Sequence, residues 1–197
     1  MPLPAPAPRT PMHTRRVTYQ GFQRDDGLWD IEGELHDSKP FDFEIRGERR
    51  WEAGEPVHHM RLRVTFDERM VIHAIDVAMD AFPHEPCPQV MPAMQRMVGE
   101  TLGRGWRHTI QRHLGGLQGC THLRELLYNL ATAAMQSRSG SFAPSGNRPP
   151  PHLGQCHTWD FDGPVVEKVY PMFFRWRAPA KDEPSAGTTV NDPQAVR

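Results

Sequence analysis

Hydrophobic and polar residues alternate over most of residues 16–79, which is the pattern of strands that bury one face. The pattern directs the side chains of His58 and His59 to opposite faces of one strand. We therefore predict an antiparallel meander of four or five strands with one apolar face. The runs are RVTYQGF (16–22), LWDIEGEL (28–35), FDFEI (41–45), VHHMRLRVTF (57–66) and MVIHAIDVAM (70–79).

From Pro88 onward the hydrophobic period changes to that of helices. A first helical stripe runs to Leu102, and a second short helix is expected over 106–114, closed by Gly115 and Gly116. A third helix follows the glycine-rich turn in GGLQGCTHLRELLYNLATAAMQ, residues 115–136. Its apolar stripe follows the i, i+3, i+4, i+7 rule and consists of Leu123, Leu126, Leu127, Leu130 and Ala134.

The C-terminal part contains one further structured segment, CHTWDFDGPVVEKVYPMFF, residues 156–174. We expect a β-hairpin there, with Asp162 and Gly163 at its turn. The predicted fold class is therefore α+β, an antiparallel β-meander followed by two or three helices and a C-terminal β-hairpin.

Proline marks the boundaries of the predicted domain. Twelve of the 20 prolines fall near the N-terminus, within 144–151 and after Ala178. We expect disordered tails over residues 1–14 and 178–197. Between them we expect a single α+β domain over 15–177, with a flexible Pro/Ser/Gly linker over 137–151 inside it.

Composition narrows the function class. The 197 residues carry a formal charge of −1, which argues against nucleic-acid binding, and no apolar run is long enough to span a membrane. The N-terminus lacks the apolar core of a secretory signal, and three cysteines are too few for a disulfide framework. We expect a cytoplasmic protein that binds a small-molecule ligand.

The third helix has a second stripe that is polar but mostly uncharged. Solvated helix faces usually carry Lys, Arg and Glu, so we expect this stripe to line a cavity and Asn129 and Thr132 to bind a ligand. Its members are His122, Glu125, Asn129, Thr132 and Gln136.

Cys120 and His122 stand at the start of this helix. The positive end of the helix dipole stabilises a thiolate and keeps an imidazole neutral. Glu125 lies one turn on, where it can orient His122, and His58 is an alternative base. The same residues also fit a helix start capped by Thr121 with a buried, inert cysteine.

The acidic stretch near residue 30 is a second candidate site. Asp30, Glu32 and Glu34 share one strand face, with Asp37 and Lys39 just beyond. Neighbouring carboxylates perturb one another's pKa or gather a cation. The alternative is the solvated face of an edge strand.

A metal site is a further hypothesis. Its candidate ligands are Cys87, Cys120, His122 and Cys156, whose sulfur and nitrogen donors suit zinc or iron. The chain has no Cys-x-x-Cys pair, so a standard structural zinc site is not expected.

Four segments, DGLWDIEGELHDSK, GEPVHHMRLR, Gly105–Trp106 and GGLQGCTHLRELL, occur in this order and together resemble a bacterial family of unknown function. The resemblance runs from about Arg15 to Tyr170 without the linker, and implies a cytoplasmic bacterial protein without naming a reaction. The family commonly has a carboxylate after the residue that matches His58, where this chain has His59. The resemblance draws attention to Asp30, Glu32, Gly33, Asp37, Lys39, His58, Met60, Cys87, Gly116, Gly119, Cys120, Thr121, His122, Glu125, Cys156 and His157.

Three functions remain open at this point. The first is a small-molecule enzyme for acyl or carbonyl hydrolysis or transfer, with Cys120 as nucleophile and His122 or His58 as base. The second is a metal-binding or iron–sulfur-handling protein, whose order of elements loosely resembles iron–sulfur scaffold proteins. The third is a non-catalytic, ligand-binding accessory protein.

Overall fold

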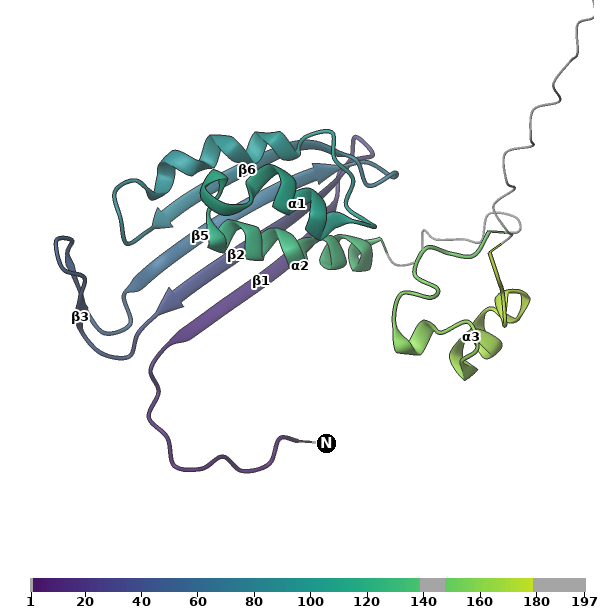
Figure 1. The fold of residues 1–197 in the computed structure, drawn as a ribbon, viewed down its shortest axis with the longest axis horizontal. Coiled ribbons are helices and arrows are strands. Elements are labelled where there is room, and N and C mark those ends of the chain that lie inside the picture. Colours follow the sequence, from purple (N-terminus) through teal and green to yellow (C-terminus); the bar gives the residue numbers. More distant parts are fainter. Residues whose placement is uncertain (1, 139–147, 179–197) are drawn as a thin grey trace, which may run out of the picture. The chain divides into compact units, whose positions relative to one another are not determined.

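The computed structural model describes residues 2–138 and 148–178 (Figure 1). The chain divides into two compact units, 1–139 and 140–197, where the sequence predicted one domain over 15–177. Residues 2–13 lie outside helices and strands. The predicted tail after residue 178 and most of the predicted linker lie outside the described residues.

A four-stranded antiparallel sheet forms the first layer of the first unit, and the predicted meander is confirmed. Its strand order is β1-β2-β5-β6, so each strand of the sheet lies beside the next one along the chain. The strands are β1 (Thr14–Gln23), β2 (Trp29–Ser38), β5 (Pro56–Phe66) and β6 (Ile72–Ala81).

A small hairpin is inserted between β2 and β5. Its strands β3 (Phe43–Glu44) and β4 (Arg50–Trp51) pair only with each other. The meander therefore has four of the four or five strands predicted, and the run 41–45 contributes no strand to it. Phe43 instead stacks on Trp51 with ring centroids 5.2 Å apart, so its apolar surface is covered within the hairpin.

Helices cover one face of the sheet, and the other face is left open in the described part of the first unit (Figure 1). They are η1 (Cys87–Met97), α1 (Trp106–Leu114), η2 (Gly116–Gln118) and α2 (Thr121–Ser137). The predicted helical segments are all present. The first is a 3₁₀ helix, and Pro92 within it disfavours an α-helix because it lacks an N–H and crowds the preceding turn.

The core of the first unit lies between the sheet and the helices that cover it. The five residues of the predicted apolar stripe of α2 are fully buried, and they pack with Ile31, Leu35 and Met60. Each buried leucine contributes about 1.5–3 kcal/mol through removal of its side chain from water. The indole N–H of Trp106 donates to the carbonyl of Leu127 at 2.7 Å, which fastens α1 to α2.

The second unit is helical where the sequence predicted a hairpin, so that prediction is wrong. It contains η3 (His157–Trp159), α3 (Pro164–Val169) and η4 (Pro171–Phe173). α3 and η4 each begin with a proline. The first turn of a helix does not need the N–H that proline lacks, whereas a strand inside a sheet would lose a hydrogen bond there. Leu153, Val166 and Phe173 form a separate small core.

Candidate metal centre

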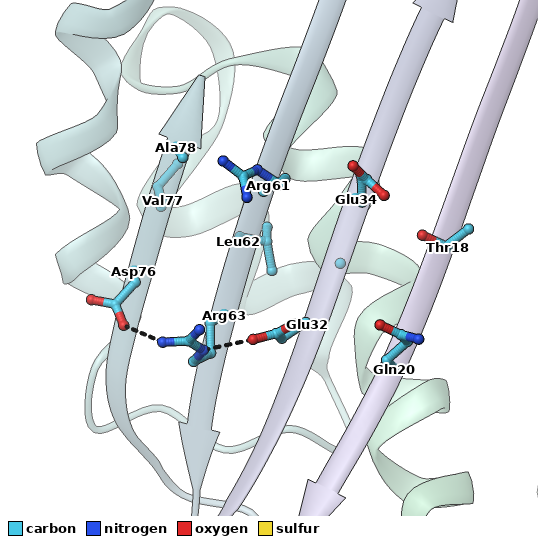
Figure 2. A pocket seen from close by; sticks show the side chains of 11 residues that line it. Thr18, Gln20, Glu32, Glu34, Arg61, Leu62, Arg63, Asp76, Val77 and Ala78 are labelled. Carbon is cyan, nitrogen blue, oxygen red and sulfur yellow. Dashed lines mark hydrogen bonds and ion pairs between the residues drawn. The ribbon is translucent and has the colours of Figure 1, made fainter. Parts of the chain in front are cut away.

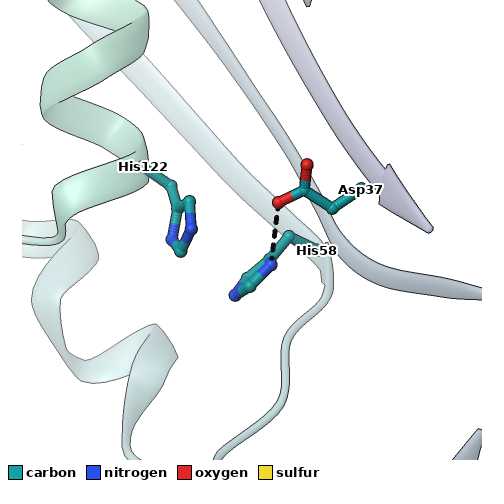
Figure 3. Close-up of side chains that lie close together, drawn as sticks. All are labelled: Asp37, His58 and His122. Atoms are coloured by element: carbon teal, nitrogen blue, oxygen red, sulfur yellow. Dashed lines mark hydrogen bonds and ion pairs between the residues drawn. The ribbon is translucent and has the colours of Figure 1, made fainter. Parts of the chain in front are cut away.

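The end of β2 and the beginning of β5 place two polar side chains beneath α2. Asp37 pairs with His58 in the strand register, as Leu35 pairs with Met60. Because side chains alternate along a strand, Asp37 and His58 lie on the same helix-covered face as buried Leu35 and Met60. The first turn of α2 brings His122 to the same place (Figure 3).

Asp37, His58 and His122 point toward one another (Figure 3). Nδ1 of His58 lies 3.1 Å from Oδ2 of Asp37, and the two imidazole rings have centroids 3.9 Å apart. One ligand atom from each residue lies within 4.8 Å of the other two. Among the described residues, this is the one group of three or more such side chains with that geometry.

Arg15 holds the Asp37 carboxylate from the neighbouring strand. Its Nε donates to Oδ1 at 2.8 Å and its Nη2 to Oδ2 at 2.7 Å. The imidazole of His13 also lies 3.1 Å from Oδ1. Burial alone would raise the pKa of Asp37, which is only 2% exposed, but the hydrogen bonds and charge of Arg15 outweigh burial and lower it. Asp37 is therefore a carboxylate at neutral pH.

Both histidines of the group are neutral at neutral pH. The pKa of His58 is lowered to about 4, chiefly by burial and then by the neighbouring His122, although the charge and hydrogen bond of Asp37 act in the opposite direction. Burial also lowers the pKa of His122, with a contribution from the positive charge of Arg15. Neutral imidazoles have lone pairs available for a metal or a proton.

The predicted pair at the helix start is close in space. Sγ of Cys120 lies 3.8 Å from Nδ1 of His122. Glu125, however, does not orient His122 as expected, because its carboxylate pairs with Arg15. A guanidinium carries a full charge, so it attracts the carboxylate more strongly than a neutral imidazole does.

Asp30, Glu32 and Glu34 of β2 lie on the open face, away from Asp37 and the two histidines. Glu32 and Glu34 line a hollow of about 450 Å³ whose wall also includes Arg61 and Arg63 (Figure 2). Each carboxylate has a polar neighbour across the sheet. Asp30 accepts from Thr65 at 2.6 Å, Glu32 from Arg63 at 2.8 Å, and Glu34 contacts His59 at 2.7 Å. These pairs fit the solvated-face interpretation.

The remaining predicted ligand-binding residues lie elsewhere in the first unit. Nζ of Lys39 lies 5.5 Å from the ring centre of Phe41 and 5.3 Å from that of Phe43. Asn129 and Thr132 are exposed and line a hollow of about 500 Å³ between α1 and α2.

The structure does not bring the predicted cysteine ligands together with His122 as a group. Cys87 begins η1, and the group around His122 includes neither Cys87 nor Cys120. Cys156 belongs to the second unit, whose position relative to the first is not defined. In the sequence, Asp37 and His58 belong to two different candidate sites. Only the strand register that pairs them shows that they share one site with His122.

Comparison with known proteins identifies the family. A family model described as "Protein of unknown function (DUF2889)" matches residues 13–136. The chain belongs to the DUF2889 family. The DUF2889 match contains Asp37, His58 and His122 together with Arg15 and Glu125, and it ends before Cys156.

No curated protein and no solved structure matches the chain. Of the helices in the described residues, none has the length and apolar character needed to cross a membrane.

Proposed function

We propose that this DUF2889 protein binds one transition-metal ion between Asp37, His58 and His122, and that zinc or iron is the metal. The observation that carries the proposal is the convergence of three ligand atoms within 4.8 Å from β2, β5 and the start of α2. Two imidazoles and one carboxylate are ligands that suit Zn²⁺ and Fe²⁺ better than Mg²⁺ or Ca²⁺, which prefer oxygen.

The protonation states favour metal binding. A metal ligand must present a lone pair, and burial keeps both imidazoles neutral while Asp37 remains ionised. The contact between His58 and Asp37 is a hydrogen bond in the absence of metal. A cation bound to Nδ1 would require the neutral tautomer of His58 that carries its proton on Nε2, so that Nδ1 presents its lone pair.

Arg15 is compatible with a cation at this site. A carboxylate has about four lone-pair positions, and Arg15 occupies one on each oxygen of Asp37. Glu125 pairs with Arg15 and offsets its positive charge. Arg15 thus acts as an outer partner that fixes the orientation of a ligand, as such partners do at many metal sites.

Three protein ligands leave a coordination position for a small molecule, as in catalytic rather than structural zinc sites. Sγ of Cys120 lies 3.8 Å from Nδ1 of His122, so a soft group stands beside the proposed site. The proposal therefore includes a small-molecule ligand bound at the metal, and a cytoplasmic location, which the uneven number of cysteines supports.

The test is metal analysis of the purified full chain, followed by titration of the metal-free protein with Zn²⁺ and with Fe²⁺ under anaerobic conditions. We expect one equivalent of metal and its loss in His58→Ala and in His122→Ala. His59→Ala is the matched control, because His59 is the next residue on the same strand but faces the open side. Metal binding unaffected by either of the first two variants would refute the site.

A second candidate function rests on the contact between Cys120 and His122. A thiol beside a neutral imidazole at a helix start can lose its proton to that imidazole and act as a nucleophile toward an acyl or carbonyl group. Rapid labelling of metal-free protein by iodoacetamide at neutral pH, lost in Cys120→Ala and slowed in His122→Ala, would support it. Slow labelling of the wild type would count against it.

A further inference from the structure

The two edges of the sheet differ in how they are covered. On β6, the segment after η1 covers the outer edge, since the Ile72 N–H donates to Glu100 at 2.9 Å and the Gly99 N–H donates to Ile72 at 2.8 Å. The Gln95 side chain also donates to the carbonyl of Ile75 at 2.7 Å. On β1, no strand among the described residues pairs with the outer edge.

The free edge of β1 is long and regular. Ten consecutive residues pair with β2 without a register shift, and nine of the ten are exposed. Proteins usually protect such an edge with a bulge, a proline or a lysine, because its unpaired N–H and C=O groups are a template for another strand. β1 has no bulge, proline or lysine, and of its two charged residues Arg15 is engaged by Asp37 and Glu125 within the chain, which leaves Arg16.

The flank of α2 beside this edge carries the uncharged polar stripe noted in the sequence. Glu125 pairs with Arg15, and Asn129 lies within hydrogen-bonding reach of the Tyr19 hydroxyl. Farther along, Ser137 lies so close to Gly21 that a side chain on Gly21 would collide with it. Helix α2 therefore follows β1 over most of its length. Beyond Glu125, the exposed members of the stripe, Asn129, Thr132 and Gln136, carry no charge.

We propose that this face, the outer edge of β1 with the adjoining flank of α2, binds a second copy of the chain by antiparallel pairing of β1 with β1. Two identical edges related by a two-fold axis have matching backbone donors and acceptors, and the two sheets become one sheet of eight strands. Low charge is the compositional mark of interface centres. The proposal does not depend on the metal centre.

The sequence of β1 is compatible with its own copy across such an axis. An axis perpendicular to the sheet pairs residues whose side chains lie on the same face. With the axis at Thr18, Thr18 faces its counterpart, Arg16 faces Gln20, and Val17 faces Tyr19. In these pairs two threonines meet, Arg16 has the neutral Gln20 as its partner, and the β-branched Val17 lies against the ring of Tyr19. Such cross-strand pairs are favourable, and none of them opposes like charges.

The first experiment is sedimentation of the full chain from about 1 µM to about 100 µM, where a self-association should follow mass action. We expect the wild type to reach twice the monomer mass. Thr18→Lys should weaken the dimer at least about fivefold, because two ammonium groups then meet at the axis. Within one copy the new lysine lies opposite Glu34 in the register, so the fold should be retained.

Ala74→Lys is the matched control, since Ala74 is exposed on the same open face but lies on β6. It should dimerise like the wild type. A wild-type protein that stays monomeric at every concentration would overturn the proposal, as would a folded Thr18→Lys variant that dimerises normally.

Hydrogen exchange gives an independent readout that needs no variant. The β1 amides that point outward should be protected more strongly at high than at low protein concentration. Protection that does not change with concentration would overturn the dimer. None of these measurements responds to metal, so failure of the metal proposal would leave this result unaffected.

Discussion

His58 and His59 are neighbours in the chain, yet their imidazoles lie on opposite faces of the sheet. His58 contacts Asp37 and His122 beneath α2, whereas His59 contacts Glu34 on the open face. The register of β5 therefore selects which of two adjacent histidines can share a site with α2. This confirms the predicted opposite orientation of the pair.

The first prediction concerns the pH dependence of metal binding. Both imidazoles of the group have a lowered pKa, that of His58 being about 4, so protons compete weakly for them near neutrality. We expect the Zn²⁺ affinity to change little between about pH 7.5 and about pH 6, measured by competition with a chelator of known affinity. A steep loss centred near the ordinary histidine pKa of 6.5 would contradict this.

The second prediction concerns the stability of the metal-free chain in acid. In the unfolded chain His58 titrates near 6.5, while in the folded chain burial lowers its pKa to about 4. Between these values the unfolded chain binds a proton that the folded chain excludes, so the free energy of unfolding should fall as pH falls from 6.5 toward 4.

Urea denaturation at several pH values measures this dependence, and His58→Gln should flatten it over the same range. Asp37 acts in a different window. Its pKa is lowered from 3.8, so its contribution to stability is lost only at pH values near and below 3.8. An unchanged slope in His58→Gln would show that other groups cause the dependence.

The third prediction concerns Arg15 as a positioning residue. Arg15→Gln removes the two-point hydrogen bond to Asp37, so the carboxylate loses its fixed orientation and its pKa should rise. Loss of such an outer partner costs about 10–100-fold in metal affinity. We expect this loss to exceed the gain from removing a positive charge, because Glu125 already offsets that charge.

Zn²⁺ titration of Arg15→Gln and of Arg63→Gln checks the Arg15 prediction. Arg63 also pairs with a carboxylate, Glu32, but on the open face, so its variant should bind Zn²⁺ like the wild type. Tighter binding in Arg15→Gln would show that charge repulsion, rather than positioning, dominates at Asp37.

The fourth prediction concerns the core beneath α2. Leu126 is fully buried, and Leu126→Ala should lower the free energy of unfolding by about 2–5 kcal/mol through lost burial and a residual cavity. Leu117→Ala is the control, because Leu117 is fully exposed and its variant should unfold like the wild type. Denaturant unfolding followed by circular dichroism measures both, and equal stabilities would contradict the packing of α2.

Much of the fold could be predicted because it follows from local periodicity. Apolar residues at every second position predicted the strands of the meander, and the leucine stripe predicted α2. Both patterns arise because the face of a strand or helix that packs into the core must be apolar. The failures occurred where local patterns are short. FDFEI alternates over only five residues, and the stretch after Cys156 alternates weakly and contains two prolines that begin helices.

The candidate site was predicted only in part. His122 was assigned as a metal ligand from its place at a helix start, but its predicted partners were cysteines. Asp37 was grouped with Asp30 and Glu32, although the pleat of β2 places it on the opposite face from them. The sequence also offered no reason to connect Arg15 with Asp37, which lies 22 positions away.

The sequence by itself determined the four strands of the meander and the helices that follow them, the buried stripe of α2 and the opposite orientation of His58 and His59. These properties depend on residues a few positions apart, whose relation is set by backbone geometry. Only the tertiary structure decided that Asp37, His58 and His122 meet. Their meeting depends on strand register and on where α2 crosses the sheet, and both are set by side-chain packing over the whole core.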